Sequence, residues 1–349
     1  MILLNSMSRR RFARFSMLAG FACAHTLALA QTRPEKPRLV IAVDGKHALT
    51  CLPLVIADQL GYFRAEGLDV QISDHADAAA ASQALLSGTA DVCSGPFERT
   101  LFMQARGRML KAFVLQGRAP QIAFGVSTRS LPGYAAITDL RGKKLGIMAV
   151  DSTSSLIVQL LLKRGGLGGK DVTLSPSGSW VNALNALRSG QIDALANTDP
   201  VITLLEQKGE IKIVSDTRTL KGAADLFGGI MPSACLFAPI EFVQKNPETC
   251  QSLANAIVHS LKWLQTAGPG DMIKTMPESY LLGDRSLYLA GFNKIRQSLS
   301  TDGLMPDEGP EIALKALVEA DPVLRLAKIN TAKTYTNEFV RRAKTRFKL

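Results

Sequence analysis

Short apolar segments alternate with amphipathic segments along most of the chain. Residues 38–43 form an apolar run that is typical of a buried strand, and residues 52–60 form a helical segment that Gly61 ends. Residues 68–72 alternate apolar and polar positions, as a strand near a sheet edge does. After them, we expect an alanine-rich helix over 76–86 and short strands at 90–93, 111–115 and 122–126.

The same rhythm begins again near residue 144. A strand is predicted over 144–149, and the helix that follows over 154–163 places its leucine and isoleucine side chains on one face. Further strands are predicted at 172–174, 194–197 and 211–214, and helices at 181–187 and 201–207. Regular alternation of this kind predicts α/β architecture, in which parallel sheets carry helices on both faces.

A third stretch begins near Gly228. It opens with a strand at 234–238, and Asn246–Glu248 then supplies a cap, a first-turn proline and an early acid for a long helix. From this order we expect two doubly wound lobes. Residues 31–127 and 229–349 would form lobe 1, and residues 128–228 would form lobe 2. The chain would then cross between the lobes twice, near 126–127 and near 228–229, and two crossings make a hinge.

The first thirty residues are typical of an export signal. Four arginines at positions 9, 10, 11 and 14 precede a moderately apolar run that ends in Ala28-Leu29-Ala30, so we expect cleavage after Ala30. The run is too short and too interrupted to span a bilayer stably. The sequence Ser-Arg-Arg-Arg-Phe at 8–12 is similar to a twin-arginine signal, although an ordinary secretory signal with an arginine-rich start would also fit. The predicted location is the periplasm.

The formal net charge of +11 is concentrated at the two ends of the chain. Four positive charges lie in the signal, and residues 328–349 hold seven Lys or Arg against one Glu, so the body between is nearly neutral. No basic stripe with aromatic readers marks a nucleic-acid interface. The basic tail is interpreted as a solvated helix face. The alternative is a functional one, in which the tail contacts a membrane surface or a partner protein.

Cysteines and histidines do not form a metal-binding pattern. Four cysteines remain after the signal, and their pairing as disulfides cannot be chosen from the sequence, although Cys51 and Cys93 would lie near neighbouring strand ends. No two histidines have metal-ligand spacing, and there is no Cys-x-x-Cys. We therefore expect no metal and no cofactor. Serine-hydrolase, phosphate-loop and dinucleotide motifs are also absent, so no catalytic residue is predicted.

Several blocks of the sequence resemble one family in the same order. The segment 53–70 (PLVIA, then GYF, then EGLDV) is similar to the opening block of the binding proteins for nitrate, sulfonate, taurine and thiamine precursors. The later blocks are SGTAD at 87–91, LRGKKLG at 140–146, LRSGQIDA at 187–194, Asp199-Pro200, and the pattern Phe242 to Glu248. Together they cover roughly residues 38–270. Asp199-Pro200 departs from the Glu-Pro that is usual in the family.

The resemblance implies a type II periplasmic-binding-protein fold and an ABC-importer role. The protein would capture a small, anionic or zwitterionic molecule of the sulfonate, taurine or carboxylate kind. It would act as a monomer that contacts the inner-membrane permease peripherally, and the permease's ATPase would drive import. Two alternatives remain open: binding or synthesis of a thiamine pyrimidine, and ligand sensing for a membrane partner. The cysteine-rich motif of the synthases (CCCFC) is missing here.

Candidate ligand residues follow the expected strands, because ligands of open α/β sheets bind beyond the carboxyl ends of strands. Ser152, Thr153 and Ser154 are the strongest group, because they offer hydroxyls at the start of a helix whose free N–H groups favour an acid group. One of them is expected to be only the helix cap. The other candidates are Lys46, His47, Thr50, Ser94, Gln116, Asn182, Asn197 and Asp199.

Three of these other candidates, and Trp180 near Asn182, also have a simple structural interpretation. Lys46 would neutralise an acid, or be an ordinary surface lysine. Asp199 would bind a ligand amine, or cap the helix after Pro200. His47 would contact the ligand, or make a routine hydrogen bond. Trp180 would form an aromatic wall beside Asn182, or pack half-buried.

Overall fold

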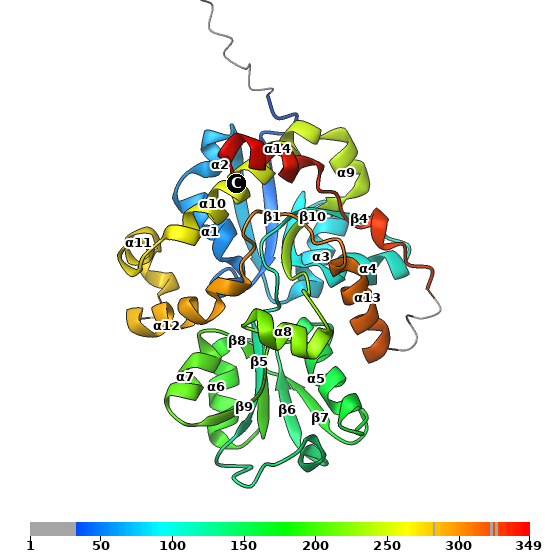
Figure 1. Cartoon of the computed structure of the whole chain (residues 1–349), viewed down its shortest axis with the longest axis vertical. Coiled ribbons are helices and arrows are strands. Elements are labelled where there is room, and N and C mark those ends of the chain that lie inside the picture. The colour runs from blue at the N-terminus through cyan, green and yellow to red at the C-terminus, as the bar shows by residue number, and fades with distance from the viewer. Residues whose placement is uncertain (1–32, 282, 322–323, 325–326) are drawn as a thin grey trace, which may run out of the picture. The chain divides into compact units, whose positions relative to one another are not determined.

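A computed structural model describes residues 33–281, 283–321, 324 and 327–349 (Figure 1). Residues Pro34–Leu349 form one compact unit, which contains the whole described fold. The predicted signal at residues 1–30 lies outside the described residues. Among those that are described, no helix is both long and apolar enough to cross a membrane.

Within the described residues, the first of two sheets has five strands. They are β1 (Arg38–Asp44), β2 (Asp69–His75), β3 (Val92–Pro96), β4 (Leu110–Leu115) and β10 (Ala234–Pro239). Their order is β2-β1-β3-β10-β4. β1 pairs in parallel with β2 and β3, and this register sets Asp44 opposite His75. β10 is antiparallel to both of its neighbours.

The second sheet repeats this plan. Its strands are β5 (Ile122–Ser127), β6 (Lys144–Ile147), β7 (Thr173–Pro176), β8 (Ala194–Thr198) and β9 (Ile211–Asp216). Their order is β7-β6-β8-β5-β9. β6 pairs in parallel with β7 and β8, whereas β5 is antiparallel to β8 and β9. The α/β fold class predicted from the sequence is confirmed, with one antiparallel strand in each sheet that the alternation did not reveal.

The antiparallel strand β5 also moves the first crossing between the lobes. The sequence placed that crossing near 126–127, but β5 belongs to the second sheet, so the chain crosses in the connection 116–121. The physical reason is direction. A chain that leaves β4 at the carboxyl edge of the first sheet enters the second sheet at its carboxyl edge and must run antiparallel there. The chain returns through residues 228–233, between α8 (Leu220–Phe227) and β10.

Helices flank both sheets (Figure 1). The first sheet with its helices is called the first lobe, and the second sheet with α5 to α8 the second lobe. Helices of the first lobe before the crossing are η1 (Leu49–Cys51), α1 (Leu52–Gln59), α2 (Tyr62–Ala65), α3 (Ala78–Ser87) and α4 (Glu98–Ala105). Those of the second lobe are η2 (Ile137–Leu140), α5 (Thr153–Arg164), α6 (Trp180–Ser189), α7 (Val201–Gln207) and α8. The sequence analysis missed α2, α4 and α8.

The C-terminal third of the chain is helical and contacts both lobes. Its elements are α9 (Ile240–Lys245), α10 (Pro247–Thr266), α11 (Pro269–Thr275), η3 (Glu278–Tyr280), α12 (Arg285–Ile295), η4 (Arg296–Ser298), α13 (Gly309–Ala320), η6 (Thr331–Lys333) and α14 (Glu338–Phe347). α13 packs against α5 and α8, and α12 packs against α7. Ion pairs Arg164–Glu319 and Lys294–Glu206 accompany these contacts. Segments that the sequence assigned to lobe 1 therefore also hold the second lobe.

The long helix α10 begins where the sequence predicts, but its cap is different. Asn246 makes no side-chain capping bond; its amide donates to the Phe242 carbonyl instead. The carboxylate of Glu35 accepts hydrogen bonds from the backbone N–H groups of Glu248 and Thr249. Although partial burial opposes it, these bonds lower the pKa of Glu35. A side chain far away in the sequence thus takes the place of the local cap.

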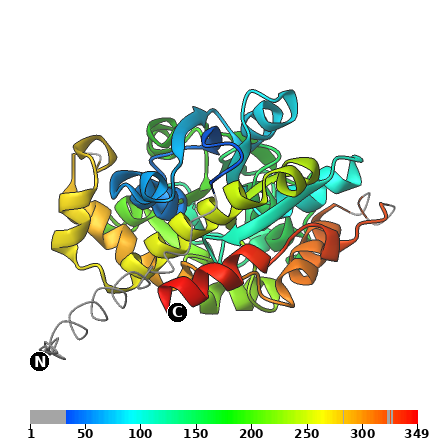
Figure 2. The same ribbon diagram turned by 90° about the horizontal axis from the view of Figure 1, so that it is seen from above.

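The basic C-terminal tail is a helix that packs against the body of the protein. α14 lies along α10 through buried Phe339, Val340 and Ala343 (Figure 2, red and yellow). Lys344 pairs with Asp302, and Arg346 with Glu66. The tail is therefore an amphipathic helix whose basic face is exposed, as the sequence predicted, and whose charges are in part paired.

Gln121, in the first hinge connection, has an unfavourable backbone conformation. It is almost completely buried, its φ is 61°, and neither polar atom of its side-chain amide has a partner among the described residues. We expect Gln121→Gly to be more stable than Gln121→Ala by about 1 kcal/mol, because both delete the amide but only glycine adopts this φ freely. Urea unfolding followed by circular dichroism compares the two variants. Equal stabilities would show that the backbone is not strained.

Candidate functional site

A cavity of about 440 Å³ lies at the carboxyl edges of both sheets, and residues of both lobes line it. We call it the main chamber. Its first-lobe lining is Asp44, Gly45, His47, Ala48, His75, Ala76, Asp77 and Ala78. Its second-lobe lining is Met148, Ala149, Ser152, Gly178, Ser179, Trp180, Asn197, Thr198, Asp199, Pro200 and Val201. Both its position and its volume are typical of a small-molecule site in an α/β protein.

A smaller inner chamber of about 50 Å³ adjoins the main chamber toward the hinge. The two share Asp44, Ala78, Met148, Ser152 and Thr198. Residues from both hinge connections, Pro120 and Ser233, close its far side together with Thr50, Ser94 and Thr153. A ligand group that enters the inner chamber would therefore contact the segments that must bend when the lobes move.

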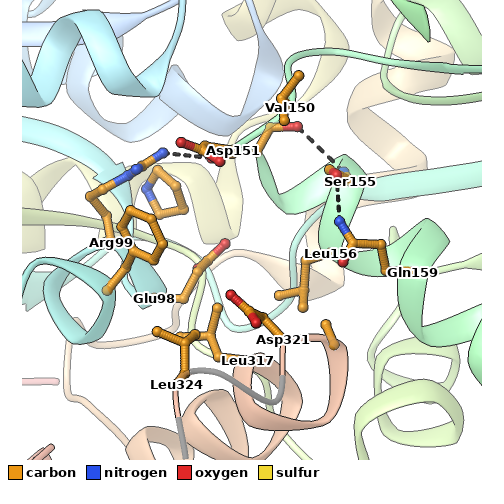
Figure 3. A pocket seen from close by; sticks show the side chains of 14 residues that line it. Glu98, Arg99, Val150, Asp151, Ser155, Leu156, Gln159, Leu317, Asp321 and Leu324 are labelled. Carbon is orange, nitrogen blue, oxygen red and sulfur yellow. Dashed lines mark hydrogen bonds between the residues drawn. The ribbon is translucent and has the colours of Figure 1, made fainter. Parts of the chain in front are cut away.

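A third, side chamber of about 220 Å³ lies between α4, the start of α5 and the end of α13 (Figure 3). Glu98 and Asp321 point into it, and Arg99 reaches across to the Asp151 backbone. Leu156, Leu317 and Leu324 form its apolar side. It shares Pro96 and Ser152 with the inner chamber, so the three chambers surround the N-terminus of α5.

The structure brings seven of the eleven predicted ligand residues to the main and inner chambers. The main chamber holds His47, Ser152, Asn197 and Asp199, and the inner chamber holds Thr50, Ser94 and Thr153 together with Ser152. The other four are absent from the described linings of the three chambers. They are Lys46, Gln116, Ser154 and Asn182.

Local hydrogen bonds explain the positions of three of those four residues. Gln116 is fully buried and its amide donates to the Ser94 hydroxyl at 2.8 Å, so it supports a lining residue from behind. The Lys46 backbone N–H donates to Asp74, which fixes the loop after β1. Asn182 is exposed on α6, and its N–H binds the cap Ser179.

The run of hydroxyls at 152–154 mainly organises its own loop. Ser152 caps α5: its hydroxyl accepts the N–H of Ser155 at 3.4 Å and donates to the Ala149 carbonyl at 2.6 Å. The fully buried Ser154 hydroxyl accepts the N–H of Met148 at 2.9 Å. These bonds use two of the three hydroxyls to hold the loop that separates the chambers.

The third hydroxyl forms a bond between the lobes. Thr153 on α5 donates to the Glu98 carboxylate on α4 at 2.5 Å. Nearby, the Arg99 guanidinium donates to the Asp151 carbonyl at 2.6 Å. The Glu98 carboxylate thus lies at the positive end of α5, where the sequence predicted the acid group of a ligand. Burial raises the pKa of Glu98, although the bond from Thr153 opposes that rise.

Asp199 both caps a helix and faces the main chamber. It is buried, and its Oδ1 accepts the Thr203 N–H at 2.8 Å. The same carboxylate pairs with the fully buried Arg218, whose guanidinium also binds Glu206 and Asp216. Burial raises the pKa of Asp199 despite the Arg218 charge. Of the two interpretations from the sequence, the capping role is present, and the carboxylate is already paired.

Asp44 is a chamber-lining residue that the sequence analysis missed. It is the last residue of β1 and lines both the main and the inner chamber. Burial raises the pKa of Asp44 to about 7; its backbone N–H and Arg99 lower that value, and Glu98 and Asp77 raise it. Ligands bind beyond strand ends, and Asp44 is the first residue after the strand predicted at 38–43. It could therefore have been included among the candidates.

Aromatic side chains form part of the main-chamber wall. Trp180, at the start of α6, keeps 41% of its surface exposed although it is large and apolar. His47 lies against Tyr280 of the C-terminal third, with ring centroids 4.5 Å apart. An exposed tryptophan at a cavity is a ready contact surface for an apolar or ring-bearing ligand.

All four cysteines after the signal are buried free thiols, so the Cys51–Cys93 disulfide considered from the sequence is not formed. Burial raises the pKa of Cys250 to about 12 and raises that of the other three thiols as well. Within the described part of the chain, no cluster of three or more His, Cys, Asp or Glu could hold a metal ion.

Comparisons with known proteins agree with this geometry. A family model described as NMT1/THI5 like matches residues 49–267. A solved structure from Bordetella bronchiseptica RB50 is 48% identical and covers 91% of this chain and 100% of its own, with a TM-score of 0.87. The alkanesulfonate-binding protein SsuA from Xanthomonas axonopodis pv. citri, solved with bound MOPS, is 18% identical with a TM-score of 0.66, over 86% of this chain and 98% of its own.

One curated relative is the binding protein YtlA of Bacillus subtilis (strain 168), whose name gives no ligand. It is 22% identical over 279 residues, which are 75% of this chain and 78% of its own. The structural likeness confirms the periplasmic-binding-protein fold expected from the sequence.

Proposed function

The chain belongs to the NMT1/THI5-like family, and on this basis we propose that it is the exported ligand-binding component of an ABC importer. It encloses a small organic molecule between its two lobes and delivers it to a permease in the inner membrane, where the permease's ATPase drives import. From the sequence, the molecule is anionic or zwitterionic, of the sulfonate, taurine or carboxylate kind. The chain itself performs no bond chemistry.

The main chamber is the observation that carries this proposal. Both lobes line it, at the carboxyl edges of two similar sheets, and the inner chamber extends it to both hinge connections. A ligand that contacts both lobes favours the conformation in which they are together, because only that conformation gives it both sets of contacts. Binding is thereby coupled to a change that a permease could recognise.

Export to the periplasm completes the proposed role. The arginine-rich segment before residue 30 supports export, and its similarity to a twin-arginine signal favours export in the folded state. The SsuA structure from Xanthomonas, which shares the fold, is that of an alkanesulfonate-binding protein. That supports an acid-bearing ligand for this chain as well, without fixing its structure.

A thermal-shift screen of the purified exported protein tests the proposal. Its panel contains sulfonates, carboxylates, pyrimidines, amino acids and nitrate. A compound that binds only the folded form stabilises it by about 2.7 kcal/mol when its concentration is a hundred times Kd. The melting temperature rises as a result. Small-angle scattering with that compound should then show a smaller radius of gyration. Binding without compaction would contradict the capture mechanism, and turnover of a pyrimidine precursor would favour an enzyme.

A further inference from the structure

The main and inner chambers have an acidic lining. Three carboxyl groups face them, those of Asp44, Asp77 and Asp199, and no lysine or arginine is among the described residues that line either chamber. Lys46, which the sequence offered as the partner of a ligand acid, is not part of these linings. A cleft with charge of one sign and low-dielectric walls concentrates ligands of the opposite charge.

The three carboxyl groups differ in whether a protein group already binds them. Asp199 is paired with Arg218. Asp77 is the N-cap of α3, and its Oδ1 accepts the Ala80 N–H at 2.8 Å. The charge of Arg99 acts on the Asp44 carboxyl group, but apart from its own backbone N–H no hydrogen bond or ion pair within the described residues holds that side chain. Asp44 is therefore the one of these three carboxyl groups that no other protein group holds within the described residues.

The position of Asp44 suits a ligand that enters both chambers. It stands where the main and inner chambers meet, on the rigid end of a strand that is paired on both sides. On the second-lobe side of the main chamber, the lining includes the apolar residues Trp180, Met148 and Val201. Asp44 is partly exposed to the chambers, yet its surroundings disfavour the charge of an unpaired carboxylate. The natural complement is therefore a positively charged hydrogen-bond donor.

We infer that the ligand carries a protonated nitrogen that pairs with Asp44 and an apolar or ring portion that lies against Trp180. This inference rests on the proposed capture function. It keeps zwitterions from the proposed ligand class, excludes simple anions and adds organic cations. A simple anion, which the sequence allowed, would face the acidic lining without a counter-charge. If the ligand also bears an acid, that group must lie away from Asp44.

The pairing has a pH signature, because Asp44 must be ionised to hold the nitrogen. Since burial raises the pKa of Asp44 to about 7, affinity for a cationic nitrogen should fall about tenfold between pH 8 and pH 6. Other groups in this region also titrate or carry charge. They are His47, Cys51, His75, Asp77, Cys93, Glu98, Arg99 and Asp199. A variant at Asp44 separates its contribution from theirs.

Matched probe pairs test the inference by calorimetry on the exported protein. Taurine is compared with ethanesulfonate, and 2-phenylethylamine with phenylacetate. We expect the nitrogen-bearing probe to bind at least tenfold more tightly than its partner. Asp44→Asn should abolish that preference together with its pH dependence. Asp77→Asn is the control, because asparagine keeps the α3 cap while one charge leaves the same chamber, and it should keep most of the preference.

The outcomes separate this inference from the proposed function. Asp44→Asn removes a charge that burial disfavours, so it should fold as stably as the wild type, which urea unfolding verifies. Tighter binding and compaction with ethanesulfonate or phenylacetate would overturn the inference and leave the capture function in place. An unchanged preference in Asp44→Asn would overturn it too. No binding and no compaction with any compound of the wider panel would contradict the capture function itself.

Discussion

Replacing Arg218 with methionine should lower the free energy of unfolding by about 3–5 kcal/mol, because it leaves the buried Asp199 without its cation. The Arg218 side chain is fully buried. Its guanidinium contacts Asp216 at 2.7 Å and Glu206 at 3.1 Å as well as Asp199 at 3.3 Å. Since a domain is stable by about 5–15 kcal/mol in total, this one change would remove a large share of the stability.

The effect should depend on pH. Burial alone would raise the pKa of Asp216, but hydrogen bonds from Arg218 and its charge lower it. A carboxyl group whose pKa is lowered on folding stabilises the protein at any pH above its pKa in the unfolded chain. That stabilisation is lost as the pH falls through the lowered pKa of the folded state. The variant lacks this contribution, so its deficit relative to the wild type should shrink in acid.

Two controls separate the charge from the loss of side-chain packing. The double variant Arg218→Met with Asp199→Asn should regain part of the lost stability, because the asparagine can still cap α7 without a buried charge. Lys221→Met breaks an exposed pair with Asp225 close to Arg218 in the sequence and should change stability by less than about 0.5 kcal/mol. Urea unfolding at several pH values measures all of these. Equal losses in the single and double variants would mean that packing, not charge, dominates.

Thr153→Val should lower the free energy of unfolding by about 1–3 kcal/mol, because it removes the side-chain donor of the buried Glu98 carboxylate. The other oxygen of that carboxylate, Oε2, already lacks a partner among the described residues. Because the Thr153–Glu98 bond crosses between the lobes, the variant should also be more open. Small-angle scattering of the ligand-free protein should then give a larger radius of gyration than for the wild type.

The sign of the pH effect distinguishes this bond from a simple packing defect. Burial raises the pKa of Glu98, and losing the hydroxyl of Thr153 should raise it further. A carboxyl group whose pKa is raised on folding stabilises the protein increasingly as the pH falls through that pKa. The loss of unfolding free energy in Thr153→Val should therefore be smaller in acid. Thr153→Ser keeps the hydroxyl and should stay close to the wild type. A deficit that is equal at pH 5 and pH 8 would contradict this assignment.

The sequence by itself determined the local elements and the class of fold. Alternating short apolar runs and one-face helices depend on neighbouring residues, so the strands at 38–43 and 194–197 and the helix at 154–163 were all found. Leu253, Ile257 and Leu261 recur at helical spacing in the sequence, and all three are buried on α10. The rule that ligands meet strand ends selected Thr50, Ser94, Ser152 and Asn197, and all four line the chambers.

Only the tertiary structure decided which groups are already paired and which remain available to a ligand. The Glu98 carboxylate lies at the N-terminus of α5, where the sequence predicted the acid group of a ligand. Arg218 neutralises Asp199 from nineteen positions further along the chain. Glu35 caps a helix that begins more than two hundred residues later. Burial and charge pairing arise from contacts between distant segments, which no local pattern of residues records, and they make Asp44 the open carboxyl group of the cleft.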